Sequence, residues 1–110
     1  MSVEIQLFAA EITLGTIDAQ IIDASMGVLG GKLKPSEVYY TYFQAFFRAH
    51  GKKTDWQGLE ALGLKTTALL TGELRAVGGI CITDVEGLGE IEVEVCGIDC
   101  LIMNELFPEA

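Results

Sequence analysis

The stretch VEIQLFAAEITLGTIDAQIIDASMGV, residues 3–28, decides which fold class the sequence favours. Spacings of four and three residues alternate strictly between its apolar positions, which are Val3, Leu7, Ala10, Leu14, Ile17, Ile21, Ala24 and Val28. Such a heptad stripe is typical of an amphipathic helix. Glu4, Glu11 and Asp18 fall on the opposite face. The pattern predicts one long helix, or two helices that meet at Gly15 and Thr16.

A strand is the alternative for the start of this stretch, because Val3, Ile5 and Leu7 alternate with Glu4 and Gln6. Helix remains the favoured interpretation for residues 2–14 and for residues 16–29. The stripe offers more apolar face than a 110-residue chain readily covers, and exposed apolar patches mark interaction sites. We therefore expect a homodimer in which a two-fold axis packs the stripe against itself.

Three further helices are expected between residues 35 and 77. Pro35 suits a first helical turn and Gly51 suits a C-terminal cap, which predicts a helix over residues 35–50. Thr54 and Gln57 fit a capping box, so a second helix is expected from there to about Gly63. A third is expected over residues 65–77, whose apolar face would hold Leu69, Leu70, Leu74 and Val77.

The hydrophobic period changes from about 3.6 to two after residue 79, which predicts an antiparallel β-hairpin over about residues 80–96. Its turn is expected at residues 87–89, GLG. A one-residue slip would turn an apolar face outward, so the expected register sets Ile82 opposite Val93 and Cys81 opposite Glu94. Residues 101–107 fit a short strand or a terminal helix equally well.

The predicted fold class is α+β, mainly helical, with this one hairpin in a single domain over residues 1–110. The length suits one domain, and a 50% hydrophobic content suits a folded chain.

The net charge of −9 repels phosphate backbones and anionic membranes, which disfavours nucleic acid as a partner. Apolar runs are too short to cross a bilayer and the start lacks a basic secretory signal, so no membrane partner and a cytoplasmic location are expected. The three cysteines are then expected to be reduced thiols.

The expected register brings Cys81, Glu94 and Cys96 close together, and Gly97 allows the chain to bend so that Cys100 returns toward them. Three thiolates and one carboxylate, or His50 in its place, would form an acceptable zinc site. Core packing is the favoured interpretation of the cysteines, because no Cys-x-x-Cys motif occurs and free cysteines are commonly buried. No cofactor is firmly predicted, and zinc is the alternative to test.

Aromatic residues crowd the helix predicted over residues 35–50. At helical spacing Tyr39, Phe43, Phe46 and Tyr42 share a face, and Phe47 points elsewhere. Core packing with a subunit contact is the simpler interpretation, and a pocket for a small hydrophobic ligand is the alternative. The chain lacks a phosphate-binding glycine motif, a nucleophile elbow and a zinc-protease helix, so an enzyme is disfavoured.

Residues 35–95 resemble a winged helix-turn-helix domain, and LGLKTTALLTGELRAVGGI, residues 62–80, is similar to that family's turn, recognition helix and first wing strand. The resemblance implies that Lys65, Thr66, Thr67 and Arg75 would face a DNA groove.

The stretch LRAVGGICITDVEGLGEIEVEVCGIDCLIMNELF, residues 74–107, resembles the 4-vinyl-reductase-type ligand-binding domain. That resemblance implies a small-molecule sensor, in some members with a cysteine-rich zinc site, which would give Cys81, Glu94, Cys96 and Cys100 a role.

The sequence thus favours a non-catalytic small-ligand-binding or regulatory domain that forms a homodimer. The alternative is a winged-helix module that binds nucleic acid or a protein partner.

Overall fold

The computed structural model describes residues 2–108, in which one antiparallel sheet has the strand order β5-β4-β1-β2-β3-β7-β6. The strands are β1 (Val3–Ala9), β2 (Ile12–Asp23), β3 (Val28–Pro35), β4 (Leu64–Ala68), β5 (Gly72–Leu74), β6 (Gly79–Asp84) and β7 (Ile91–Cys96). The helical elements are η1 (Tyr39–Phe43), α1 (Gln44–Lys52), α2 (Trp56–Leu62) and α3 (Cys100–Leu106).

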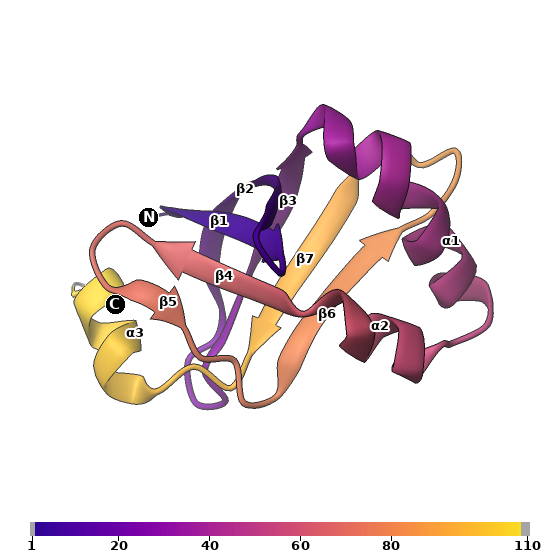
Figure 1. Ribbon diagram of the computed structural model, residues 1–110. Coiled ribbons are helices and arrows are strands. Elements are labelled where there is room, and N and C mark those ends of the chain that lie inside the picture. Colours follow the sequence, from indigo (N-terminus) through magenta and orange to yellow (C-terminus); the bar gives the residue numbers. More distant parts are fainter. Residues whose placement is uncertain (1, 109–110) are drawn as a thin grey trace.

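The sheet curls into a half-barrel, so that its β4–β1 part crosses in front of its β3–β7 part in Figure 1. The core lies on the concave side, where Leu7, Leu14, Leu29 and Val93 are almost fully buried. One end is covered by η1 and α1, which bury Tyr39, Phe43 and Phe47. At the other end α3 and the residue after it bury Met103, Leu106 and Phe107. The edge strands of the half-barrel are β5 and β6.

The helices predicted over residues 2–14 and 16–29 are wrong, because this segment forms β1, β2 and the start of β3. The strand alternative for the start of the stretch is confirmed: in β1 the buried Ile5 and Leu7 alternate with exposed Glu4 and Gln6. The register of β1 and β2 passes from Leu7–Gly15 to Phe8–Thr13, so Leu14 is an extra residue in a β-bulge.

The apparent heptad stripe combines this bulge with a tight turn. The spacing of seven from Leu7 to Leu14 spans the turn between β1 and β2, and the spacing of three from Leu14 to Ile17 spans the bulge. Both leucines and Ile17 are buried in the core of the sheet. The predicted dimer seam is therefore absent from the described residues, and the homodimer loses the helical stripe on which it was predicted.

The helix predicted over residues 65–77 is also wrong, because these residues form β4, a tight turn and β5. β-Branched Thr66 and Thr67 suit a strand. Leu69 and Leu70, expected on a buried helical face, are exposed in the turn. Gly72 follows with φ +78°, a backbone angle that residues other than glycine rarely adopt. Thr66, Thr67 and Gly72 therefore fit a hairpin better than a helix.

Other predictions are confirmed. The register of β6 and β7 sets Ile82 opposite Val93 and Cys81 opposite Glu94, as expected. The helix predicted over residues 35–50 is found as η1 and α1, but Pro35 ends β3 and Gly51 lies within α1, which is capped at Lys53, so its predicted start and glycine cap are wrong. As predicted, α2 ends at Gly63, whose φ of +62° makes the left-handed cap. The carboxylate of Asp55 caps α2 by accepting from the Gly58 amide, in place of the predicted Thr54. The C-terminal segment is the helix α3.

The fold class is therefore corrected from mainly helical with one hairpin to mainly antiparallel sheet with short helices. The label α+β still applies, but strands dominate. The sequence suggested helices over residues 3–28 because the bulge interrupts the period-two pattern of the strands and produces spacings that imitate those of a helix. No helix within residues 2–108 is long and apolar enough to cross a membrane.

Candidate functional site

A groove of about 720 Å³ lies between β6 and the pair α1–α2. Its first wall consists of six consecutive residues, 78–83, from β6 and the residue before it. A cavity that faced only one side of a strand would contact alternate residues, because successive side chains point to opposite faces. The unbroken run shows that the groove follows the free edge of β6.

The second wall comes from segments remote in sequence. Phe47 of α1, Leu59 of α2 and Leu64 of β4 supply apolar surface. Trp56, the single tryptophan, lies at the groove with 65% of its surface exposed. The wall also carries Glu60. An apolar and aromatic lining with few polar groups is the usual character of a binding site.

His50 connects α1 to α2 beside the groove. Its Nδ1 accepts a hydrogen bond from the Asp55 amide at 2.9 Å, its ring stacks on Phe46 with centroids 5.9 Å apart, and Trp56 meets it edge-on at 5.1 Å. Because Nδ1 accepts, a neutral His50 carries its hydrogen on Nε2 and has one donor left. The His50 ring therefore packs between Phe46 of α1 and Trp56 of α2.

A buried carboxylate fixes α1 against the end of β6. Asp84 is only 5% exposed, and its oxygens accept hydrogen bonds from Tyr39 Oη at 2.8 Å, Gln44 Nε2 at 3.1 Å and Arg48 Nε at 3.1 Å. Burial, together with the hydrogen bond to Asp84, raises the pKa of the Tyr39 hydroxyl well above its usual range. With three donors bound, Asp84 acts as an anchor for the groove wall.

The four aromatic residues predicted to bind a ligand do not converge on the groove. Tyr39 and Phe43 are buried in the core, Phe46 is half-buried and Tyr42 is 74% exposed. None of them lines the groove, whereas Phe47 does.

The reason is a π-helical turn at Tyr39–Phe43, which adds about one residue relative to an α-helical turn. The added residue rotates the later positions, so Phe47 shares the face of Tyr39 and stacks on it at 6.0 Å. A constant period of 3.6 residues could not have predicted this.

The cysteines are partly brought together. Cys81 lies opposite Glu94 in the ladder, and burial raises the pKa of the Cys96 thiol, with smaller contributions from nearby Cys81 and Glu94. Cys100 begins α3 and is exposed, as is Cys81, while Cys96 is half-buried. Within residues 2–108 no group of three or more His, Cys, Asp or Glu side chains is placed to hold a metal ion. The zinc site remains a prediction.

The residues expected to face a DNA groove lie on strands. Lys65, Thr66 and Thr67 belong to β4, Thr66 is fully buried, and Arg75 follows β5. The described chain has no recognition helix at residues 65–77, so the winged-helix arrangement is not formed.

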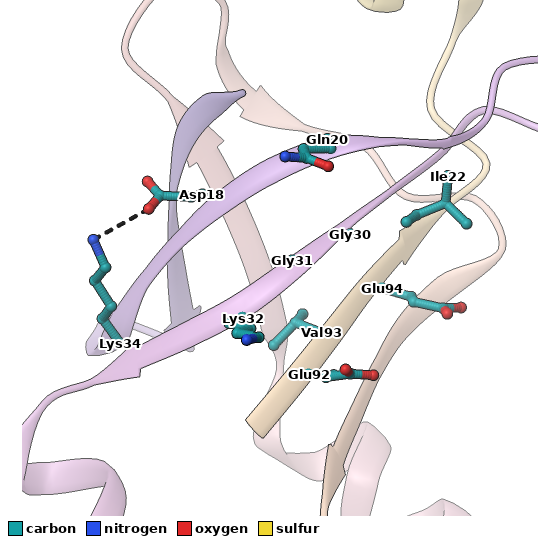
Figure 2. A pocket seen from close by; sticks show the side chains of 10 residues that line it. All are labelled: Asp18, Gln20, Ile22, Gly30, Gly31, Lys32, Lys34, Glu92, Val93 and Glu94. Atoms are coloured by element: carbon teal, nitrogen blue, oxygen red, sulfur yellow. Dashed lines mark ion pairs between the residues drawn. The ribbon is translucent and has the colours of Figure 1, made fainter. Parts of the chain in front are cut away.

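A second hollow of about 440 Å³ lies over β2, β3 and β7 (Figure 2). It exists because Gly30 and Gly31 carry no side chain where β3 lies between β2 and β7. Its cations are already paired: Lys34 Nζ lies 3.1 Å from Asp18 Oδ2, and Lys32 Nζ lies 2.8 Å from Glu90 Oε1. These pairs are exposed and contribute little energy, and the other polar side chains that line the hollow are Gln20, Glu92 and Glu94.

The groove joins residues 47–64 to residues 78–83, and no local spacing in the sequence shows that they meet. Cys81 and His50 both line it, whereas the sequence favoured core packing for the cysteines and offered zinc binding only as an alternative for both residues. Comparison with protein-family models, with curated proteins and with solved structures found no match. The geometry of the site is therefore the basis for a function.

Proposed function

We propose that this chain is a non-catalytic binding domain whose ligand lies in the groove between β6 and α1–α2. The observation that carries the proposal is the groove itself, about 720 Å³ in volume, with the apolar surface of Phe47, Leu59 and Leu64 and the aromatic rim of Trp56. Burial of such surface favours binding at roughly 25 cal/mol per Å² of apolar area.

Binding is favoured over catalysis by the state of the titratable groups. His50 uses Nδ1 to accept from the Asp55 amide, and the buried carboxylate of Asp84 already accepts from three side chains. A general base needs a free acceptor within hydrogen-bond reach of the substrate. The regulatory role expected from the sequence is compatible with such a site.

Two expectations about cellular context stay part of the proposal. Three free cysteines suit a reducing compartment such as the cytoplasm. Homodimer formation now needs a surface other than the predicted stripe, and light scattering at micromolar concentration measures it directly.

Trp56 provides the test, because it is the single tryptophan and lies at the groove. A library of small apolar fragments is titrated against the protein while Trp56 fluorescence and the ¹⁵N–¹H spectrum are recorded. We expect shifts confined to residues 47–64 and 78–83.

Leu59→Arg places a charge in the apolar wall and should weaken fragment binding at least about tenfold. Leu70→Arg is the matched control, because Leu70 is exposed in the β4–β5 turn and does not line the groove. Shifts that map mainly to the hollow over β2 and β3, or equal binding by both variants, would contradict the proposal.

A further inference from the structure

The free edge of β6 exposes backbone polar groups to the groove, and an apolar small molecule could not form hydrogen bonds with them. Within residues 2–108, β6 pairs only with β7, so its other side presents backbone N–H and C=O groups without a strand partner there. A ligand that covered this edge without hydrogen bonding to it would leave dry polar groups, at a cost of roughly 1–3 kcal/mol each.

The backbone groups that face the groove can be assigned. The Cys96 carbonyl accepts from the Gly78 amide at 2.9 Å, so the backbone groups of Cys96 point toward β6. Along an extended antiparallel strand these groups alternate sides, so Glu94 also points toward β6, and Cys81 is its partner. The N–H and C=O of Ile80 and Ile82 therefore point away from β7, along the edge that lines the groove.

The two edge strands of the sheet differ in their protection. β5 has only three residues and includes Glu73, so it is short and charged. β6 has six residues, GICITD, with no lysine and no proline, and its one acidic residue, Asp84, is buried in the hydrogen-bonded anchor. Natural proteins blunt exposed edges with short strands, charges or proline. A covering helix is another such device, and α1 packs against β6. At the groove beside α1, however, the strand carries neither a charge nor a proline.

We infer that the ligand of the groove is an extended peptide segment of a partner protein, which adds to β6 as an eighth strand. This inference depends on the proposed function, since it names the ligand class of the same groove. Six residues of strand span about 20 Å at 3.3–3.4 Å each, which sets the length of the bound segment at about six residues. Backbone hydrogen bonds supply affinity in such strand addition, and side-chain pockets supply specificity.

The side chains and charge of the segment follow from the walls. Alternate residues of an added strand point into the concave side, where Phe47, Leu59 and Leu64 present apolar surface. Glu60 is the one Asp, Glu, Lys or Arg side chain among the described residues that line the groove, and the chain carries a net charge of −9. The fitting segment therefore alternates apolar residues and is flanked by Lys or Arg.

A phage-displayed library of random decapeptides, selected on the full chain, tests this inference. Selected peptides should share an alternating apolar core with cationic flanks, and their binding should weaken as salt rises. Methylation of single backbone nitrogens in a synthetic selected peptide leaves the protein unchanged. Binding should fall at least tenfold at alternate positions of the core and change little at the positions between, because only every second amide faces β6.

A protein variant provides the reciprocal test. Ile82→Pro removes an amide that points away from β7, a position where an edge strand tolerates proline, and should weaken peptide binding at least tenfold. Ile82→Val retains the amide and should bind within about twofold, and the ¹⁵N–¹H spectrum checks that both variants are folded.

An empty selection, uniform tolerance of N-methylation, or a dimer that occupies the β6 edge would overturn the inference. If fragments bind in the groove while no peptide does, the peptide inference fails and the proposed function stands. If neither binds there, both fail.

Discussion

Replacement of Tyr39 by Phe removes one hydroxyl from the anchor that holds η1 and α1 on β6. Tyr39 is fully buried and donates to Asp84 Oδ2 at 2.8 Å. The phenylalanine ring keeps the stacking on Phe47, so the change removes a hydrogen bond to a charged acceptor and little else. Such a bond contributes about 1.5–3 kcal/mol to the free energy of unfolding. We expect a loss of that size.

Urea unfolding measures the loss, and Tyr42→Phe is the matched control. Tyr42 is an exposed residue of the same helical turn, so its hydroxyl should contribute less than about 0.5 kcal/mol. The slope of unfolding free energy against urea should stay the same in both variants. Equal effects of the two substitutions would refute the assignment of Tyr39 and Asp84 as an anchor.

The same pair predicts a pH dependence. Because burial and Asp84 raise the pKa of Tyr39, the folded state retains a proton that the unfolded state releases above about pH 10. The stability contributed by Tyr39 is therefore fully present below that pH and declines above it, by about 1.4 kcal/mol per pH unit. The difference between wild type and Tyr39→Phe should shrink between about pH 10 and pH 11, and a constant difference would show that the hydroxyl is not held in its protonated form.

Three further substitution and labelling experiments test the fold. Leu14→Glu puts a charge in the core and should unfold the chain, whereas Ile22→Glu, at an exposed position of the same strand, should cost under about 1 kcal/mol by thermal unfolding; a folded Leu14→Glu would contradict the bulge. Gly31→Ala would overlap the Asp18 carbonyl and should cost about 1–3 kcal/mol, whereas Gly51→Ala in α1, with open space, should gain about 0.5–1 kcal/mol. Because burial raises the pKa of Cys96, iodoacetamide at about pH 8 should label the exposed Cys81 and Cys100 before Cys96, as peptide mass analysis can show; faster labelling of Cys96 would disagree with its position.

The sequence predicted the parts of the fold in which the apolar residues keep a single spacing along the whole element. Ile80 and Ile82 alternate along β6, as Val93 and Val95 do along β7, so a single register buries both sets. The prediction failed where an irregular backbone changes the number of residues between side chains that share a face. The bulge at Leu14 turned a strand pattern into a heptad, and the π-helical turn at Tyr39–Phe43 moved Phe47 onto the face that had been assigned to Phe46.

The candidate site was less predictable than the fold, because its two walls meet only through the curl of the sheet. The residues next to Leu59 and next to Ile80 in the sequence do not indicate that the two side chains line one groove. The free edge of β6 is likewise a property of strand order, since it depends on β7 pairing with β3 on its other side. Strand order between distant segments does not follow from periodicity.

Amide hydrogen exchange of β6 in the free protein tests the open edge most directly. The amides of Cys81 and Thr83 point toward β7 and should be protected, whereas those of Ile80 and Ile82 point into the groove and should exchange much faster. Residue-resolved exchange by NMR is therefore expected to alternate along Ile80, Cys81, Ile82 and Thr83. Equal protection of all four amides would show that the edge is already covered, and would contradict an open groove beside β6.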